Sequence, residues 1–462
     1  MWHRLERHKL PLVIVIAITV RIAALIVFRP HFAFSEPGGV IHGSVAYDEY
    51  ALNLLGTGVY GRVAGRPDAD LPPLYSAVLA LVYGLFGRHY LAVAALQIVF
   101  DALSIALLYD ICRRLLPRRD QGGDWIGALA GLLFALYPYL IFQNLTLNDT
   151  ALWILLLQLF VWLLIRLRQR ATHDRGVLAL AIAAGLVLGV SVLARGLLPP
   201  LALLAVPWFL LKLGWRETLR RLLPVAALGL LVPLPWIIRS SAIYEGFVPI
   251  ALNSGENIYQ GNNPYAAAVF RAGYDAQWLT PPLDAPPKSE KLRRNAFLAQ
   301  AGWRYLRDNP ADALDLMLVK LLVYWNPQVT PRRNLRAGEK LSVDDDGGVV
   351  ILTDAGSHVG VSAANAAYQE EGLFNVVGRR LHLVYFGLAW LLAVAGAWLS
   401  RRDWRMLSLL VIAQVSQTLV YLVFHPSTRY RSPTDPLLFV FSSYSLLWLV
   451  TWWRARRVSQ SN

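Results

Sequence analysis

The sequence predicts an all-α polytopic membrane protein with about 10–12 transmembrane helices, and with short helices and loops at the outer membrane surface. Three observations support this fold class. Of the 462 residues, 56% are apolar and only 16% are charged, whereas a soluble domain carries roughly 25% charged residues. Apolar runs long enough to cross a bilayer recur along the chain, and arginines cluster between them. A soluble core could not enclose so much apolar surface.

The net charge of +14 reflects membrane topology better than nucleic-acid binding. A nucleic-acid-binding protein gathers its basic residues on one continuous face. Here the arginines lie in short clusters, as the positive-inside rule predicts for cytoplasmic loops. We therefore expect no nucleic-acid partner. The single cysteine, Cys112, excludes an intramolecular disulfide and a cysteine-based metal site.

The first apolar run, 10–28, is too long for the core of a signal peptide, and no small-residue cleavage site follows it. We interpret it as the first span. A spanning helix needs about 20 apolar residues, with a range of about 17 to 25. Nine further runs are good candidates: 90–112, 124–142, 150–167, 177–194, 197–212, 219–240, 379–400, 405–425 and 433–453. The runs 72–87 and 313–326 are marginal, because Pro72-Pro73 opens the first and Lys320 interrupts the second.

Charge decides how the two marginal runs are placed. If neither crosses the membrane, four basic loops and both basic termini fall on one side, which the positive-inside rule identifies as the cytoplasm. If both crossed, three of those loops would move outside. We therefore predict ten spans, with both termini cytoplasmic and with 72–87 and 313–326 as interfacial helices on the outer side.

This topology leaves two long outer loops, 29–89 and 241–378, in a chain that we expect to form a single domain over 1–462. The run 343–353 has the pattern of a turn and a strand. Its acidic triplet, Asp344 to Asp346, could bind a cation. A solvated turn accounts for the triplet more simply.

Two acidic sites lie in outer loops. Asp48 and Glu49 begin a segment with helical periodicity, and adjacent helical residues diverge by about 100°. One of these acids could therefore face a cavity while the other makes a structural contact, or both could belong to a solvated helix start. Asp149 follows Asn148 before a span, where an N-cap is the alternative interpretation. Asp149 is on the same predicted side as Asp48, so the two could converge.

Some basic residues lie at helix ends that are predicted to face outward, although the positive-inside rule places most Lys and Arg on the cytoplasmic side. Their positions therefore need an explanation. These residues are Arg195, Arg239, Lys320, Arg429 and Arg431. Arg429 and Arg431, before Pro433, could grip a phosphate by bidentate hydrogen bonds. They could equally be interfacial anchors, with Tyr430 at the membrane surface. His425 is isolated near the end of a span, where a structural hydrogen-bonding role is the simpler interpretation.

Several motifs occur in an order that resembles one family. They are Asp48-Glu49, Pro72-Pro73-Leu74-Tyr75, Asn148-Asp149, the segment 195–200, Pro235-Trp236-Ile237-Ile238-Arg239, the segments 246–250 and 255–264, and Arg429-Tyr430-Arg431. The chain resembles the bacterial glycosyltransferases of the GT-C superfamily, which are related to protein O-mannosyltransferases and to the lipid A aminoarabinose transferase. Each motif alone is weak. Together they are specific for the superfamily but not for a substrate.

The resemblance implies transfer of a sugar from a polyprenyl-phosphate carrier to a lipid, glycan or protein acceptor at the periplasmic face. It assigns catalytic roles to Asp48 as the base, Glu49 as the organiser of its loop, and Asp149 as an acceptor-site residue or second acid. The substrate-binding set that it suggests is Tyr75, Arg195, Arg239, Lys320, Arg429, Tyr430 and Arg431. Several relatives have Lys or His where this chain has Leu71, so another group must replace that cation here.

Two questions stay open at this point. The outer carboxylates could hold Mg²⁺ or Mn²⁺, which prefer oxygen ligands, although the sequence does not require a metal. The main alternative function is a polytopic transporter or lipid flippase, which would place ionisable groups inside the spans and often shows internal repeats. Only Arg21 and Asp101 stand out in this way, and no repeat is visible. The enzymatic hypothesis predicts that Asp48, Asp149, Arg429 and Arg431 line one outer cavity.

Overall fold

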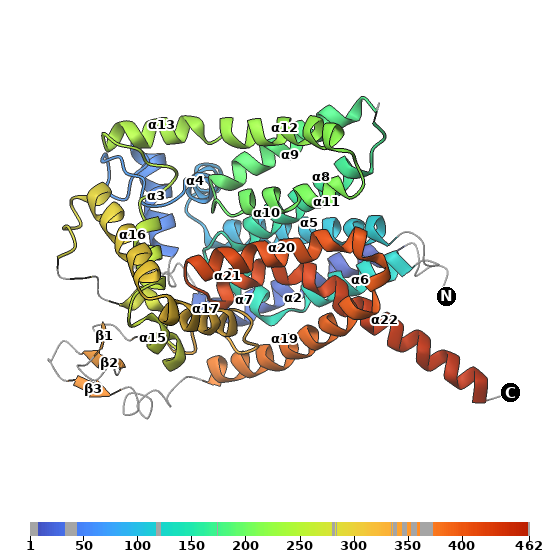
Figure 1. Cartoon of the computed structure of the whole chain (residues 1–462). Coiled ribbons are helices and arrows are strands. Elements are labelled where there is room, and N and C mark those ends of the chain that lie inside the picture. The colour runs from blue at the N-terminus through green and yellow to red at the C-terminus, as the bar shows by residue number, and fades with distance from the viewer. Residues whose placement is uncertain are drawn as a thin grey trace. The chain divides into compact units, whose positions relative to one another are not determined.

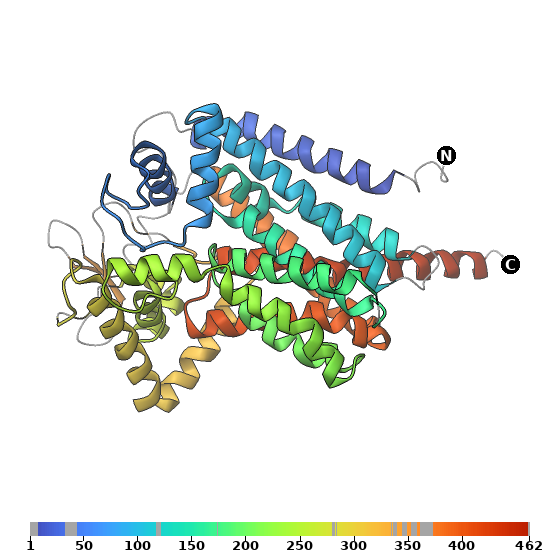
Figure 2. The same ribbon diagram turned by 90° about the horizontal axis from the view of Figure 1, so that it is seen from above.

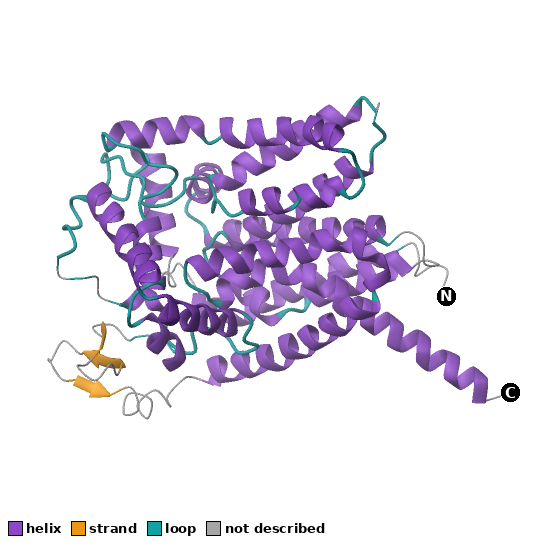
Figure 3. Cartoon of the chain, in the orientation of Figure 1, coloured by secondary structure: helices purple, strands orange, loops and turns teal. Residues whose placement is uncertain are grey.

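A computed structural model describes residues 8–32, 44–116, 122–172, 174–279, 282, 284–333, 335, 340–343, 349–352, 358–360 and 373–460. Helices dominate the described part of the chain, and its strands form one small sheet (Figure 3). The predicted all-α polytopic fold is confirmed. All ten predicted spans coincide with helices or with pairs of consecutive helices.

Among the described residues, seven helical segments are long and apolar enough to cross a membrane. They are Lys9–Phe28, Tyr90–Leu115, Thr150–Gln169, Trp215–Ile243, Val376–Leu399, Arg401–Val423 and Thr428–Arg457. An eighth span is possible if α6 and α7 are counted together, since these helices bend by 55° at a short break. The two remaining predicted spans fall on shorter apolar helices, Gly176–Val192 and Leu198–Leu210.

Contacts divide the chain into two compact units, and each is described by itself. Unit 1 comprises residues 1–243, 385–416 and 432–462, and unit 2 comprises 244–384 and 417–431. The helices α19 (Leu373–Leu399) and α20 (Trp404–Val423) each contribute to both units. The prediction of a single domain therefore stays a prediction.

Unit 1 is a helical bundle (Figure 1). Besides parts of α19 and α20, its elements are α2 (Lys9–Phe32), α3 (Ser44–Thr57), α4 (Leu74–Phe86), α5 (Tyr90–Leu115), α6 (Gly122–Ala135), α7 (Pro138–Leu145), α8 (Thr150–Gln169), α9 (Gly176–Val192), α10 (Leu198–Leu204), α11 (Val206–Leu210), α12 (Trp215–Leu231), α13 (Leu234–Ile243), the 3₁₀ turns η3 (Arg401–Asp403) and η4 (Ser432–Thr434), and α22 (Asp435–Gln460). The central helix is α8, most of whose residues are buried. Gly189 of α9 lets α12 approach closely, because a Cβ there would lie 2.5 Å from the Cβ of Val232.

The break between α6 and α7 explains the two ionisable residues found inside the spans. Pro138 at the start of α7 follows the break, and the carbonyl of Ala135 is at the end of α6, directly before it. Arg21 donates from Nη1 to the carbonyl of Ala135 at 3.0 Å, and from Nε to Asp101 at 2.6 Å. Asn144 also donates to Asp101, at 2.8 Å. The Arg21–Asp101 pair is therefore a buried, hydrogen-bonded connection between α2, α5 and the broken span.

The basic loops of unit 1 meet at one end of the bundle. Three hydrogen bonds join them: Gln169 Nε2 to the Arg114 carbonyl at 3.0 Å, Arg221 Nη1 to the Arg170 carbonyl at 3.1 Å, and Arg168 Nη1 to the Arg405 carbonyl at 3.2 Å. The first turn of α2 and the last turn of α22 lie at the same end in both views (Figures 1 and 2). This shared basic end is the one that the sequence analysis predicts to be cytoplasmic.

The other end of unit 1 contains α3 and α4. The backbone N–H of Leu74 donates to the carbonyl of Leu193 at 3.0 Å, which brings the start of α4 against the turn between α9 and α10. With 13 residues, α4 is about 20 Å long. That length is less than the roughly 30 Å of a hydrocarbon core, so α4 cannot span the membrane alone.

Unit 2 contains short helices and the sheet. Its elements are α14 (Ser254–Gly261), α15 (Ala266–Ala272), the 3₁₀ turn η1 (Ala276–Trp278), α16 (Lys291–Asp308), α17 (Pro310–Tyr324), β1 (Lys340–Val343), β2 (Val349–Leu352), β3 (His358–Gly360) and α21 (Thr428–Arg431), with parts of α19 and α20. The strands are antiparallel in the order β1-β2-β3. The strand expected within 343–353 is β2, while Asp344 to Asp346 lie outside the described residues. A core around Phe270 and Leu316 holds these elements together.

Candidate functional site

Asp48 lies in α3 and is buried against α4. Its carboxylate accepts a hydrogen bond from the hydroxyl of Tyr83 at 2.7 Å. Arg88 donates to both carboxylate oxygens, from Nη2 at 2.7 Å and from Nε at 3.1 and 3.2 Å. Asp48 is 5% exposed, whereas the Arg88 side chain is 30% exposed. Sequence reasoning missed Arg88, which follows Gly87 in a short connection between two helices and belongs to no motif.

Glu49 points away from Asp48 and binds the loop that follows α3. Its carboxylate pairs with Nε of Arg62 at 2.8 Å, and both side chains are exposed. Asp68 closes the same loop, because it accepts hydrogen bonds from the Arg62 backbone N–H at 2.8 Å and from the Tyr50 hydroxyl. Burial and the Asp68 hydrogen bond raise the pKa of Tyr50 above its usual range, so Tyr50 remains a donor.

Arg239 of α13 also binds this loop, through two of the loop's backbone carbonyls. It donates from Nη1 to the carbonyl of Asp68 at 3.1 Å and from Nη2 to the carbonyl of Tyr60 at 2.8 Å. Its guanidinium also lies over the ring of Trp236, 4.6 Å from the centroid. Within unit 1, Arg239 is thus an anchor for the loop 58–71.

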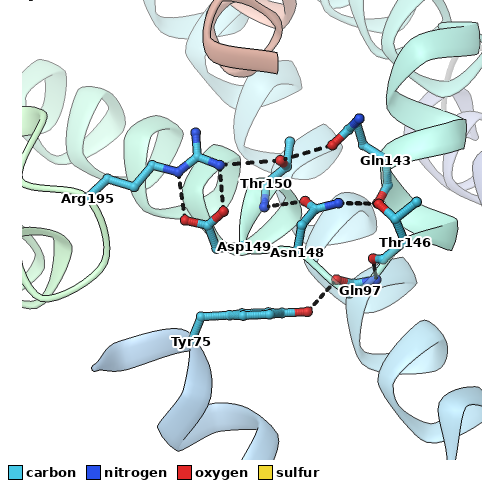
Figure 4. Close-up of polar contacts among 8 residues, drawn as sticks. All are labelled: Tyr75, Gln97, Gln143, Thr146, Asn148, Asp149, Thr150 and Arg195. Carbon is cyan, nitrogen blue, oxygen red and sulfur yellow. Dashed lines mark hydrogen bonds and ion pairs between the residues drawn. The ribbon is translucent and has the colours of Figure 1, made fainter. Parts of the chain in front are cut away.

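Asp149 sits at the start of α8 in a buried polar cluster (Figure 4). Arg195 forms a bidentate pair with it, from Nε at 2.6 Å and from Nη2 at 2.6 Å. The side chains are 2% and 10% exposed. Asp149 does not cap α8 with its side chain, because Asn148 accepts the hydrogen bond from the Thr150 N–H at 2.8 Å. Asp149 occupies the N-cap position of α8, as the alternative interpretation expects, but its carboxylate forms the ion pair with Arg195 and no capping hydrogen bond.

Tyr75 connects α4 to the same turn. Its hydroxyl donates to Gln97 at 2.9 Å, and Gln97 donates in turn to the carbonyls of Asn144 and Thr146 (Figure 4). The ring of Tyr47, the neighbour of Asp48, lies edge-on to Tyr75 with centroids 5.0 Å apart. Because Tyr83 and Tyr75 are eight residues apart on α4, the Asp48 carboxylate lies about 12 Å along the helix from Tyr75.

In unit 2, Lys320 of α17 is completely buried. Its Nζ donates to the side-chain oxygen of Asn262 at 2.8 Å and to the carbonyl of Leu422 at 2.7 Å. Asn262 also donates to the carbonyl of Val423 at 2.7 Å. Lys320 and Asn262 therefore cap the C-terminal end of α20, where a cation complements the helix dipole. Burial lowers the pKa of Lys320 to about 7.

The arginine pair of α21 is divided between two environments. Arg431 is fully buried and donates to the carbonyls of Asn326 at 2.7 Å and Tyr324 at 3.3 Å. It thereby fixes α21 to the end of α17. Arg429 is only partly buried. The ring of Tyr430 between them stacks on Tyr421 with centroids 4.7 Å apart.

His425 has an acidic partner that the sequence analysis missed. Its Nδ1 lies 3.3 Å from the carboxylate of Asp275, and both side chains are buried. The ring of Tyr430 lies edge-on to His425. Asp275 also caps η1 by accepting from the N–H of Gln277. Nothing in the sequence signals the pair, because the two residues come from distant segments that meet only in the folded unit.

The candidate residues fall into both units. Asp48, Glu49, Tyr75, Asp149, Arg195 and Arg239 lie in unit 1, and Lys320, Arg429, Tyr430 and Arg431 lie in unit 2. A common cavity for Asp48, Asp149, Arg429 and Arg431 therefore stays a prediction. Within the described ranges, no three His, Cys, Asp or Glu side chains are grouped as a metal site would require. Asp48 and Asp149 are each held by an arginine, an arrangement that does not fit a divalent cation.

Comparisons with known proteins show which families and structures the chain is similar to. Residues 70–238 match the family model described as Dolichyl-phosphate-mannose-protein mannosyltransferase. The match contains Tyr75, Asp149 and Arg195 and ends just before Arg239. No curated protein sequence matches the chain significantly.

Solved structures similar to this chain include the oligosaccharyltransferase AglB from Archaeoglobus fulgidus. In its complex with an inhibitory peptide and a dolichol-phosphate, the TM-score is 0.56 at 14% identity, covering 99% of this chain and 52% of that one. The apo form of the Archaeoglobus fulgidus enzyme gives a TM-score of 0.54 at 13% identity, covering 98% and 52%. ArnT from Cupriavidus metallidurans bound to undecaprenyl phosphate gives 0.41 at 15% identity, covering 91% and 77%, and no argument rests on it.

The chain thus spans about half the length of the archaeal oligosaccharyltransferase. At this identity, the similarity shows the fold. The family-model match over residues 70–238 and the similar fold both support the relation to the GT-C glycosyltransferases that the ordered motifs predict.

Proposed function

From this relation, we propose that the chain is a membrane glycosyltransferase that moves a sugar from a polyprenyl-phosphate-linked donor to a lipid, glycan or protein acceptor. The proposal places the reaction at the periplasmic face of a bacterial inner membrane, with both termini in the cytoplasm. The observation that carries it is the presence of two buried carboxylates, Asp48 and Asp149, each held by an arginine in unit 1. The basic loops lie at the other end of that unit.

Asp48 is the proposed base. The acceptor hydroxyl oxygen attacks the anomeric carbon of the sugar, the bond from that carbon to the phosphate oxygen breaks, and the polyprenyl phosphate leaves with the bonding electrons. The hydroxyl proton passes to the Asp48 carboxylate. Proton transfer to a positioned group typically contributes about 10²–10⁴-fold to a rate. Cationic groups stabilise the charge that develops on the leaving phosphate.

Arg88 gives Asp48 a second property. Arg88 donates charge-assisted hydrogen bonds to both oxygens of the Asp48 carboxylate, so these acceptor positions are occupied. A donor phosphate would compete with Asp48 for Arg88, whose side chain is 30% exposed. Donor binding would then release the carboxylate for proton transfer. Arg88 thereby becomes the proposed replacement for the cation that relatives carry at the position of Leu71.

The remaining candidates divide by their contacts. Glu49 and Arg239 are proposed to organise the loop 58–71 beside Asp48, as their hydrogen bonds indicate. Asp149, with Arg195 and Tyr75, is proposed to form the acceptor side of the site. The substrate contacts proposed for unit 2 are Lys320, Arg429, Tyr430 and Arg431, with Arg429 the most exposed of the cations.

The test compares cells that lack the protein with cells expressing the wild type, Asp48→Asn or Asp308→Asn. Envelope lipids, glycans and proteins are analysed by mass spectrometry for a sugar that depends on the wild type. Asp308→Asn is the control, because Asp308 lies in an exposed ion pair with Arg307 in unit 2. Asp48→Asn should abolish the sugar addition at an unchanged membrane level of the protein. Full sugar addition by Asp48→Asn would refute Asp48 as the base.

A transporter or flippase remains the alternative function to be tested. The Arg21–Asp101 pair, which first suggested it, has a structural explanation at the broken span. Translocation of a labelled polyprenyl-phosphate sugar across reconstituted vesicles, without transfer to any acceptor, would favour transport over transfer.

A further inference from the structure

An excess of positive charge lies at the basic end of unit 1, where α8 ends and α12 begins. We call this group, consisting of Arg168, Lys212, Arg216, Arg220 and Arg221, the basic corner. One carboxylate lies within it, that of Glu217, which pairs with Arg221 at 2.7 Å and with Arg220 at 3.8 Å. Five cations and one carboxylate leave an excess of four positive charges.

Arg168 is the unusual member of the basic corner. It is 2% exposed, and its guanidinium lies over the ring of Trp208 at 4.0 Å from the centroid. Its Nη1 donates to the carbonyl of Arg405 at 3.2 Å. In the part of the chain that the structure describes, Nε of Arg168 has no hydrogen-bond partner and no carboxylate pairs with the side chain. A buried charge without a counter-charge is costly.

The other cations do not relieve this cost. Arg221 is fully buried and donates to the carbonyls of Leu167 and Arg170. Lys212 lies in the turn between α11 and α12, where the charges of Arg168 and Arg221 act on it. The three cations are therefore close enough to repel one another. An anion that bound among them would be attracted by all three.

The surface beside the basic corner is apolar. Leu210, Leu211, Trp215 and Leu219 are all exposed, Trp215 to 66%. Lys212 and Arg216 are exposed between them. Cations beside exposed leucines and a tryptophan are typical of a membrane interface, where the apolar groups contact acyl chains and the cations contact headgroups. A lipid would contact both the cations and the apolar surface, whereas a free anion would contact the cations alone.

We propose that the basic corner binds the headgroup phosphate of an anionic phospholipid, with its acyl chains against Leu211, Trp215 and Leu219. Lys212 and Arg216 reach the phosphate directly. Arg168 and Arg221 are buried, and their positive charges attract the phosphate without contacting it. The inference does not depend on the proposed glycosyltransferase activity.

The test is lipid titration of the full-length protein in detergent, followed by native mass spectrometry. The probes are phosphatidylglycerol, zwitterionic phosphatidylcholine and inorganic phosphate. The variant is Lys212→Gln with Arg216→Gln, and the control is Arg456→Gln with Arg457→Gln, two exposed arginines at the same end of unit 1 that stack on tryptophans of α22. All four side chains are exposed, so the substitutions should not disturb the fold. Unchanged melting temperatures verify this.

Phosphatidylglycerol should bind the wild type more tightly than phosphatidylcholine. The Lys212 and Arg216 variant should lose about 30-fold in phosphatidylglycerol affinity, as expected for two interfacial cations. The control should keep its affinity. Equal binding of both lipids, an unchanged affinity of the variant, or an equal loss in the control would overturn the proposal. Inorganic phosphate that competes as well as the lipid would overturn the assignment to a lipid.

Discussion

Replacing Lys320 with methionine measures what the protein loses by burying an amine in unit 2. Nζ of Lys320 has two neutral hydrogen-bond acceptors, on Asn262 and Leu422, and the side chain is fully buried. Burial lowers the pKa of Lys320 from 10.5 to about 7. Because each pKa unit is worth about 1.4 kcal/mol, the charged form is disfavoured in the folded protein by on the order of 5 kcal/mol.

The sign of the pH dependence follows from proton binding. Below a pH of about 7, Lys320 is protonated in both the folded and the unfolded protein, so the burial penalty is constant. At higher pH the folded protein releases the proton while the unfolded protein keeps it, up to its ordinary pKa. The wild type should therefore gain stability relative to Lys320→Met as pH rises, by about 1.4 kcal/mol per pH unit.

The assay is reversible unfolding of both proteins in mixed micelles at a series of pH values from about 6 to about 9.5. The difference in free energy of unfolding between wild type and Lys320→Met should rise by roughly 3 kcal/mol over that range. Taking the difference cancels the titration of all other groups. Lys288→Met, at an exposed lysine of the same unit, should show no such trend. A flat difference for Lys320→Met would mean that folding leaves its proton affinity unchanged, which would refute the burial argument.

Two other predictions follow from single contacts. Asp149→Asn or Arg195→Gln should each cost about 3–5 kcal/mol of unfolding free energy, because each leaves a buried charge without its partner, whereas the double variant should lose less than the sum. Additive losses in that double-mutant cycle would show that the pair is not coupled. Gly261→Ala should destabilise unit 2 by about 1–3 kcal/mol or more, because the new Cβ would lie 2.0 Å from a backbone oxygen at the end of α20. A melting temperature equal to that of the wild type would contradict the close approach.

The spans could be predicted because lipid places one simple demand on the chain. Each crossing segment needs about 20 apolar residues and satisfies its own backbone hydrogen bonds as a helix. The same reasoning identified 72–87 and 313–326 as too short or too interrupted, and both are short helices. It did not reveal the bend between α6 and α7. Pro138 was a visible signal, but hydropathy averages over the residues where the bend occurs.

The partners of the site residues could not be predicted in the same way. Asp48 and Arg88 are 40 residues apart and meet because α3 packs on α4. The pairing of Asp275 with His425 joins even more distant segments. A sequence shows which residue types sit near which helix ends. It does not show the rotation of one helix against another, and that rotation selects the partner.

Contacts also separate two kinds of cation among the candidate residues. Arg195 is neutralised by Asp149, and Arg88 by Asp48, so each of these pairs contributes little net field beyond its own neighbourhood. Lys320 instead donates to an amide oxygen and a backbone carbonyl, which satisfy its hydrogen bonds without cancelling its charge. When it is protonated, Lys320 therefore keeps an uncompensated charge in a low-dielectric setting, where that charge acts over a longer distance. This contrast predicts that protonated Lys320 attracts an anion near it more strongly than the paired arginines of unit 1 attract one near them. It also predicts that attraction by Lys320 weakens as pH rises through about 7.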